Sequence, residues 1–340
     1  MNERNHRIAL IRRPTGIPGP DDFRLEVVDA PAPADGEFLV RNLYLSIDPA
    51  QRGWAADVAN YASPSPLGEA MRALAVGVVI GSRHPDYAAG DHLYGFFGWQ
   101  TLCAAGPADV LRRVDPELAP LSTAATLFGI NGLAAWLALT RCGEPTAGET
   151  VLVSTAAGAV GAIVGQIARN LGCRPIGLTG APDKVERCVQ RFGYAAAANY
   201  RTDDLAAFLE RAAPAGVDVF FDNTGGAILD ATLPRMASRG RIVQCGTASI
   251  PSWTPRPMGL RVEREILVRR LRWQGFVVFD HAAEFEAAVE RLDAWRRVGL
   301  VTCDEDITYD LAGAPAALAG LYRGENRGKR LIRLDGRAHG

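Results

Sequence analysis

The chain has 340 residues, of which 48% are hydrophobic, 22% charged and 8% aromatic. These proportions exclude a disordered protein, and the length is typical of about two globular domains. The 37 basic and 38 acidic residues give a formal net charge of −1, so no global field favours nucleic acid, an anionic membrane or a strongly charged partner. A small neutral ligand fits this balance better.

The sequence lacks the features of membrane proteins, of secreted proteins and of proteins stabilised by disulfides or structural zinc. It has no apolar run of about 18 residues, and its N-terminus lacks the basic-then-apolar layout of a secretory signal, so we expect a cytoplasmic location. The six cysteines form no Cys-x-x-Cys pair, which argues against a disulfide framework or a structural zinc cluster. Buried free thiols are expected.

The first 120 residues have the pattern of a mostly β unit. Short runs of alternating or β-branched residues are separated by Pro and Gly, as in strands joined by turns. We expect strands at 23–27, 38–47, 77–81 and 91–94.

From about residue 121 the pattern changes to alternating helices and strands, which is typical of a parallel sheet built from βαβ units. A helical stripe of apolar residues over 160–171 is closed by Gly172. We expect strands at 151–154, 175–178, 217–221 and 241–245.

Small residues mark the loop between the strand at 151–154 and the following helix. Ala156, Gly158 and Gly161 occupy the three small positions of a dinucleotide fingerprint. A tight turn there brings backbone N–H groups and a helix N-terminus against a pyrophosphate, and larger side chains would block that approach. The sequence therefore predicts a dinucleotide cofactor.

The end of the next strand indicates which dinucleotide is bound. An NAD site usually presents Asp or Glu there, whereas this chain has Leu178-Thr-Gly180 followed by Asp183 and Lys184. Lys184 and Lys329 are the only lysines among the 37 basic residues. Although Asp183 counts against it, the missing acid and the point charge of Lys184 favour NADPH.

Several ordered segments together resemble one family. The chain is similar to the zinc-independent prostaglandin and leukotriene reductases of the medium-chain dehydrogenase/reductase superfamily, also called alkenal double-bond reductases, which include curcumin-reductase-like proteins. The segments that carry the resemblance are Leu45–Pro49 with Arg52, Gly68–Arg72, Gly90-Asp91, Gly98–Gln100, Ala156–Gly161, Asp222–Gly226, Cys245-Gly246 and Gly324–Lys329.

The resemblance implies an α/β architecture of two domains. Residues 1–122 and 309–340 would form a GroES-like β domain for substrate and catalysis, and 123–308 an inserted Rossmann domain with a doubly wound parallel sheet. NADPH would lie in the cleft between them. Family members commonly pair as homodimers through the Rossmann sheet edge, and the run 266–271 would be such an edge strand or an interior one.

The resemblance also implies the cofactor contacts. Gly158, Ala159, Val160 and Gly161 would hold the pyrophosphate, Lys184 and Tyr200 the 2′-phosphate, and Asn223 the region around the nicotinamide. The remaining family positions that line the nucleotide are Cys245, Gly246, Phe276, Val277 and Asn326.

The chemistry expected is reduction of an activated alkene. The five histidines are scattered without ligand spacing, and the Cys and Gly-His-Glu segments of zinc-dependent relatives do not occur, so we expect no metal site. An α,β-unsaturated ketone or aldehyde can take hydride at its β-carbon, hold charge as an enolate and accept a proton at its α-carbon. One or two hydrogen-bond donors near the enolate oxygen stabilise that charge.

Two family tyrosines are replaced in this chain. Pro251 stands near the place of one and Ala50 replaces the other, which puts the proton donor in question and predicts a larger pocket for bulky enones. Tyr61 matches a family Ser-Tyr position and is our candidate catalytic donor. The candidate pocket residues are Tyr44, Ala50, Trp54 and Trp253.

Two alternatives stay open at the level of sequence. A quinone reductase of the same superfamily would share the fold and cofactor. A non-catalytic NADPH-binding protein would have kept the fold while losing the tyrosines.

Overall fold

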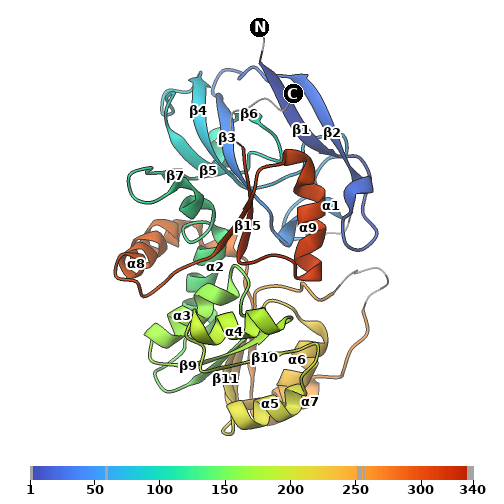
Figure 1. Cartoon of the computed structure of the whole chain (residues 1–340), viewed down its shortest axis with the longest axis vertical. Helices are drawn as coiled ribbons and strands as arrows, with labels where there is room; N and C mark the ends of the chain where they lie inside the picture. Colours follow the sequence, from blue (N-terminus) through green and yellow to red (C-terminus); the bar gives the residue numbers. More distant parts are fainter. Residues whose placement is uncertain (1–2, 58–59, 251–254, 256, 335–340) are drawn as a thin grey trace. The chain divides into compact units, whose positions relative to one another are not determined.

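The computed structural model describes residues 3–57, 60–250, 255 and 257–334 of the chain (Figure 1). These residues form two compact units. The first unit comprises Met1–Gly129 and Glu305–Gly340, and the second comprises Ile130–Asp304. The breaks therefore fall after residues 129 and 304, where the sequence analysis places them after 122 and 308.

The first unit is built on a seven-stranded sheet with the order β14-β15-β3-β4-β5-β7, in which β6 pairs with β3. Its pairs are antiparallel except for β14 with β15, and β1 and β2 form a separate antiparallel pair. The strands are β1 Arg4–Leu10, β2 Phe23–Asp29, β3 Phe38–Ser46, β4 Ala75–Ser82, β5 His92–Gly95, β6 Leu102–Ala105, β7 Val110–Val114, β14 Glu305–Thr308 and β15 Lys329–Arg333. The strands expected in this unit are thus confirmed.

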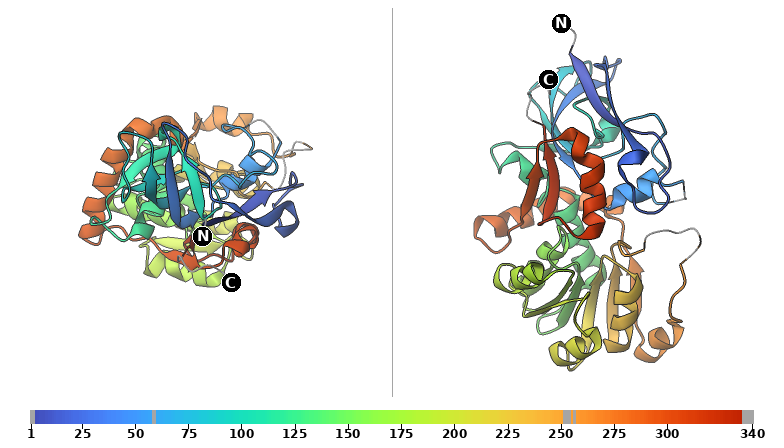
Figure 2. Two further views of the ribbon diagram at one scale, coloured as in Figure 1. Left: turned by 90° about the horizontal axis from the view of Figure 1, so that it is seen from above. Right: turned by 45° about the vertical axis from the view of Figure 1, so that its right-hand side comes forward.

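Two helices of the first unit, α1 (Ala50–Ala55) and α9 (Ala314–Arg323), lie side by side near β15 (Figures 1 and 2). They are joined by a hydrogen bond of 2.7 Å from the Tyr322 hydroxyl to the Pro49 carbonyl oxygen. Residues far apart in the sequence therefore meet at the start of α1.

The second unit contains a six-stranded parallel sheet with the order β10-β9-β8-β11-β12-β13. The chain runs outward from β8 to one edge and then from β11 to the other, so the direction of winding reverses between β8 and β11. The strands are β8 Thr150–Ser154, β9 Arg174–Thr179, β10 Ala196–Asn199, β11 Val217–Asp222, β12 Met236–Gln244 and β13 Arg272–Gly275. The alternating pattern predicted this parallel sheet, and the resemblance implied its doubly wound order.

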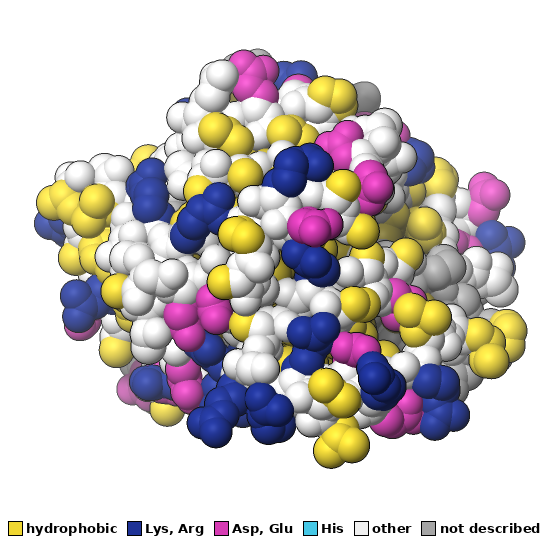
Figure 3. All heavy atoms as spheres, turned by 90° about the horizontal axis from the view of Figure 1, so that it is seen from below, with side chains coloured by type: hydrophobic (Ala, Val, Ile, Leu, Met, Phe, Trp, Pro, Cys, Tyr) yellow, Lys and Arg dark blue, Asp and Glu magenta, His cyan; other side chains and the backbone are white. Residues whose placement is uncertain are grey.

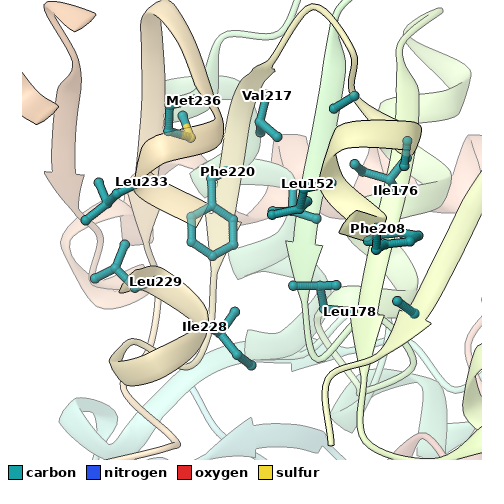
Figure 4. Close-up of a cluster of buried hydrophobic side chains, with 14 of the residues drawn as sticks. Leu152, Ile176, Leu178, Phe208, Val217, Phe220, Ile228, Leu229, Leu233 and Met236 are labelled. Carbon is teal, nitrogen blue, oxygen red and sulfur yellow. The ribbon is translucent and has the colours of Figure 1, made fainter. Parts of the chain in front are cut away.

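Helices cover both faces of this sheet. Its helices are α2 Ile130–Ala138, α3 Gly161–Asn170, α4 Pro182–Gln190, α5 Leu205–Ala212, α6 Gly226–Thr232, α7 Glu263–Arg269 and α8 Phe285–Arg297. Figure 4 shows one core layer, in which Leu152 and Phe220 of the central strands pack with Phe208 of α5 and Leu229 of α6. Burial on both faces explains why the strands read as continuous apolar runs.

The prediction of a strand at 266–271 is wrong, because most of this run belongs to helix α7. Glu263 and Glu265 occupy the first turn of α7, where carboxylates favour the helix dipole. Arg269 binds Glu265 at 2.9 Å across one turn, and the helix ends at Arg270 with a left-handed φ of 54°. The local β propensity of the run is thereby overridden, and the edge strand is β13 instead.

The mixed surface charge and the short helices agree with the near-neutral net charge and the lack of long apolar runs in the sequence. Basic, acidic and hydrophobic side chains are interspersed over the face shown in Figure 3. Within the described ranges, every helix is too short or too polar to cross a bilayer.

Candidate active site

The loop after β8 has the compact geometry expected of a phosphate cradle. Thr155 has a left-handed φ of 50°, and the Gly158 N–H donates to the Thr155 carbonyl oxygen at 2.8 Å. A Cβ at Gly161 would lie 2.3 Å from that same oxygen. Only glycine fits there, so the N-terminus of α3 can approach an anion closely.

The half-buried residues Gly158, Ala159 and Val160 complete this cradle. The Ala162 N–H donates to the Gly158 carbonyl oxygen at 2.9 Å, which joins the loop to the first turn of α3. The fingerprint residues therefore lie in a tight turn between a strand and a helix, which is the context that a dinucleotide-binding motif requires.

Basic and hydroxyl groups gather at the carboxyl end of β9. A Cβ at Gly180 would lie 2.8 Å from the Tyr200 hydroxyl oxygen and 3.2 Å from Arg201 Nε. The Tyr200 N–H donates to the Thr179 carbonyl oxygen at 2.9 Å, which fixes this approach. Lys184 is half-buried in the first turn of α4. Arg201 also lies at this end of β9. The sequence analysis did not include it among the candidate site residues, although it directly follows Tyr200.

The ends of β8, β11 and β12 are tied together around Asn223. Its backbone N–H donates to Ser154 Oγ at 2.7 Å, and its side-chain Nδ2 donates to the Ser154 carbonyl oxygen at 2.9 Å. A Cβ at Gly246 would lie 2.8 Å from the Asn223 carbonyl oxygen, so glycine allows this close approach. The Cys245 N–H donates to the Asp222 carbonyl oxygen at 2.8 Å.

Cys245 has the properties of an inert thiol. Burial, followed by the charge of Asp222, raises the pKa of Cys245 to about 12. The thiol is therefore neutral near pH 7 and unsuited to act as a nucleophile.

Phe276 and Val277 follow β13 at the same edge of the sheet. The Phe276 N–H donates to the Gln244 carbonyl oxygen at 3.0 Å, and its buried ring stacks on His281 with 4.9 Å between ring centres. Val277 is half-buried. These residues lie at the carboxyl ends of the strands, as do Asn223, Cys245 and Gly246.

In the first unit, Asn326 lies in the turn before β15 and donates from Nδ2 to the Gly328 carbonyl oxygen at 2.7 Å. Lys329 follows it and is buried, with its Nζ donating to the Ile47 carbonyl oxygen at 3.0 Å and pairing with Asp48. The second lysine of the chain is thus part of the core of this unit.

Tyr61 is exposed over 52% of its surface, and its N–H bonds to the Asn60 side-chain oxygen at 2.7 Å. Burial raises the pKa of Tyr322, Arg52 opposes this shift, and the proximity of Tyr61 adds to it. The Arg52 guanidinium lies 4.9 Å from the centre of the Tyr322 ring. Tyr322 therefore has both Arg52 and Tyr61 in its surroundings, and it is a neighbour of Tyr61 that no motif indicated.

The candidate pocket residues differ in burial. Tyr44 on β3 and Ala50 at the start of α1 are half-buried. Trp54 is only 1% exposed and packs edge-on against Phe96, so the structure places it in the core of the first unit. Trp253 lies outside the described residues, as does Pro251.

In the part of the chain that the structure describes, no three His, Cys, Asp or Glu side chains gather in a way that could hold a metal ion.

Residues 6–114 match a family described as "N-terminal domain of oxidoreductase", and 159–294 match one described as "Zinc-binding dehydrogenase".

Relatives of assigned activity match the chain from end to end. The NADPH-dependent curcumin reductase of Escherichia coli is 35% identical over 341 residues, 99% of either chain. The NADP-dependent 2-alkenal reductase of Nicotiana tabacum is 33% identical, covering 97% of this chain and 98% of the relative. The crystal structure of CurA from Vibrio vulnificus in complex with NADPH has 32% identity and a TM-score of 0.90, covering 98% of this chain and 99% of that one.

Proposed function

The chain belongs to the zinc-independent prostaglandin and alkenal reductases of the medium-chain dehydrogenase/reductase superfamily, and from this premise we propose that it is an NADPH-dependent reductase of the C=C bond of α,β-unsaturated ketones and aldehydes. The observation that carries the proposal is the cradle at Gly161, where a Cβ would lie 2.3 Å from Thr155 O. Such a cradle suits the pyrophosphate of a dinucleotide.

The residues present fit NADPH. Backbone N–H groups of Gly158, Ala159, Val160 and Gly161, together with the α3 N-terminus, would bind the pyrophosphate. Lys184, Tyr200 and Arg201 would bind the 2′-phosphate, since β9 ends in Thr179 with no acid to repel it. Within the second unit, the nicotinamide half would lie against Asn223, Cys245, Gly246, Phe276 and Val277.

NADPH, when bound, supplies a hydride to the β-carbon of the enone. Negative charge then develops on the substrate oxygen, and a donor there contributes about 3 kcal/mol of stabilisation. The α-carbon takes up a proton to complete the saturated carbonyl compound.

We assign the donor role to Tyr61. Tyr61 is exposed over 52% of its surface and matches the family Ser-Tyr position, whereas the neighbouring Tyr322 hydroxyl donates to the Pro49 carbonyl oxygen. The Arg52 cation lies beside the Tyr322 ring, and its positive charge would favour negative charge in these surroundings. The half-buried Tyr44 and Ala50 would contribute to the walls for bulky enones.

Deuterium tracing tests the reaction itself. NADPH that carries deuterium at the transferred position of C4 is incubated with the protein and a 2-alkenal. We expect one deuterium at the β-carbon of the saturated aldehyde. Deuterium at the carbonyl carbon of an allylic alcohol would refute the proposal.

The assembly we propose is a homodimer formed through β13. This strand is at the end of the sheet order and its four residues are exposed. Leu267 of the neighbouring α7 is 77% exposed, an unusual situation for a leucine. Pairing of two β13 strands would satisfy the backbone hydrogen-bonding groups at both edges and cover the Leu267 side chain.

A further inference from the structure

A buried carboxylate lies where the winding of the parallel sheet reverses. Asp222 is the last residue of β11, which pairs with β8, and its side chain is fully buried. Its two oxygens accept from five donor groups: Ser154 Oγ, Thr224 N, Thr224 Oγ1, Gly225 N and Gln244 Nε2, at 2.8–3.1 Å. Ligands of doubly wound sheets bind outside the carboxyl ends of the strands at this reversal point.

Hydrogen bonds from neighbouring groups stabilise the charge of Asp222. An ionised carboxylate is purely an acceptor, so it satisfies all of these donors. Among the residues that the structure describes, no lysine, arginine or histidine forms an ion pair with Asp222, whereas the buried Asp48 is paired with Lys329. Hydrogen bonds stabilise the buried charge without cancelling it, so its field extends to its surroundings.

This field reaches the residues assigned to the nicotinamide half. Ser154 Oγ donates to Asp222 and therefore accepts from the Asn223 N–H, which sets the direction of the whole chain of hydrogen bonds. The Asp222 carbonyl oxygen accepts from the N–H groups of Cys245 and Gly246 at 2.8 and 3.1 Å. The Asp222 charge also contributes, after burial, to the raised pKa of Cys245.

We propose that Asp222 is a positioning residue whose fixed negative charge favours the oxidised over the reduced nicotinamide, and so promotes hydride donation. The inference rests on the proposed function. The nicotinamide ring is neutral in NADPH and positively charged in NADP⁺, so a nearby carboxylate stabilises only the second form. The hydride and its electron pair go to the substrate β-carbon, the proton comes from the donor, and Asp222 neither gains nor loses a proton.

The test measures the dissociation constants of NADP⁺ and NADPH by calorimetry, without substrate. In Asp222→Asn we expect the ratio of the NADP⁺ constant to the NADPH constant to rise about tenfold, the order of magnitude for loss of one charge interaction inside a protein. The matched control is Asp218→Asn. Asp218 lies on the same strand but near its amino end, where it accepts from the Thr150 N–H at 2.8 Å, so the ratio should stay unchanged.

A second variant keeps the test decisive if Asp222→Asn does not fold. Gln244 Nε2 bonds to Asp222 Oδ2 at 3.1 Å, so Gln244→Lys would place a cation against the intact carboxylate and should raise the same ratio. An unchanged ratio in the folded variants, including equal weakening of both nucleotides, would overturn the inference. If the wild-type protein bound neither nucleotide, the proposed function would fail as well.

Discussion

Lys184 and Lys329, the two lysines of the chain, lie in opposite environments. Lys329 is 2% exposed and neutralises the buried Asp48, while Lys184 is half-buried at the start of α4. A compact ammonium suits the closed site at Lys329, where it bonds to a carbonyl oxygen and a carboxylate. Of the two lysines, Lys184 is therefore the candidate for binding the 2′-phosphate.

Removal of the Lys184 charge should discriminate between the two nucleotides. We expect Lys184→Ala to raise the KM for NADPH about tenfold and to leave NADH use nearly unchanged, because NADH has no 2′-phosphate. Steady-state kinetics with each cofactor measures this. Lys184→Arg, which keeps the charge, is the control, and equal effects of Lys184→Ala on both cofactors would contradict the phosphate role.

Loss of one hydroxyl should separate chemistry from cofactor binding. We expect Tyr61→Phe to lower kcat at least about tenfold, because the enolate loses its donor, while the Kd for NADPH stays the same. Tyr309→Phe is the matched control, since Tyr309 is also an exposed tyrosine of the first unit, at 55% exposure. Unchanged turnover in Tyr61→Phe would remove Tyr61 from the mechanism.

At the scale of elements, the second unit is held in part by the Glu149–Arg241 ion pair. Arg241 of β12, which pairs with Val219 of β11, bonds to Glu149 Oε1 at 2.8 Å, and the two side chains are only 17% and 21% exposed. Hydrogen bonding to Arg241 holds the pKa of Glu149 below its usual 4.5 despite burial. The folded state therefore favours the ionised form of Glu149.

This pair should make stability depend on pH. Since the folded pKa is lowered, the stabilisation is complete above pH 4.5 and is lost as the pH falls through the folded value. We expect Glu149→Gln to cost about 1–2 kcal/mol of unfolding free energy at pH 7 and much less at pH 3, measured by urea denaturation. In the exposed Arg261–Glu263 pair, Glu263→Gln should cost almost nothing at either pH. A deficit for Glu149→Gln that stays constant with pH would contradict this account.

Periodicity predicted the sheets because their strands are regular. The predicted strands at 38–47 and 151–154 became β3 and β8, and the loop at Gly158 lies between strand and helix as the fingerprint requires. The prediction of a strand at 266–271 failed because its apolar residues suit a strand or a helix equally well. The ion pair between Glu265 and Arg269 favours the helix. Short apolar runs do not distinguish the two states by pattern alone.

Contacts between distant residues explain what the sequence could not predict in the site. Ser154 and Asp222 are 68 positions apart, yet they share one hydrogen bond. The Tyr322 hydroxyl reaches Pro49 across 273 positions. Such pairs follow from the three-dimensional fold. The sequence marked Asp222 only as part of a resemblance segment and did not indicate its buried hydrogen bonds, and it did not mark Tyr322.

At the scale of the whole molecule, the exposed edge of β13 predicts a dimer. We expect sedimentation equilibrium to give twice the chain mass of 36.4 kDa. Leu267→Asp should shift the equilibrium toward the monomer, because it puts a charge into the covered surface. Leu25→Asp, at a leucine of the first unit that is 47% exposed, should have no effect. A monomeric wild-type protein at micromolar concentration would contradict the dimer.

The most direct test of the central claim is NADPH oxidation by the purified protein with a panel of acceptors, with every product identified by mass. The panel contains a 2-alkenal, benzylideneacetone and a quinone, and NADH is run in parallel. The account predicts saturated aldehyde and ketone, with NADPH preferred over NADH. An allylic alcohol, hydroquinone as the sole product, or no turnover despite tight NADPH binding would contradict it.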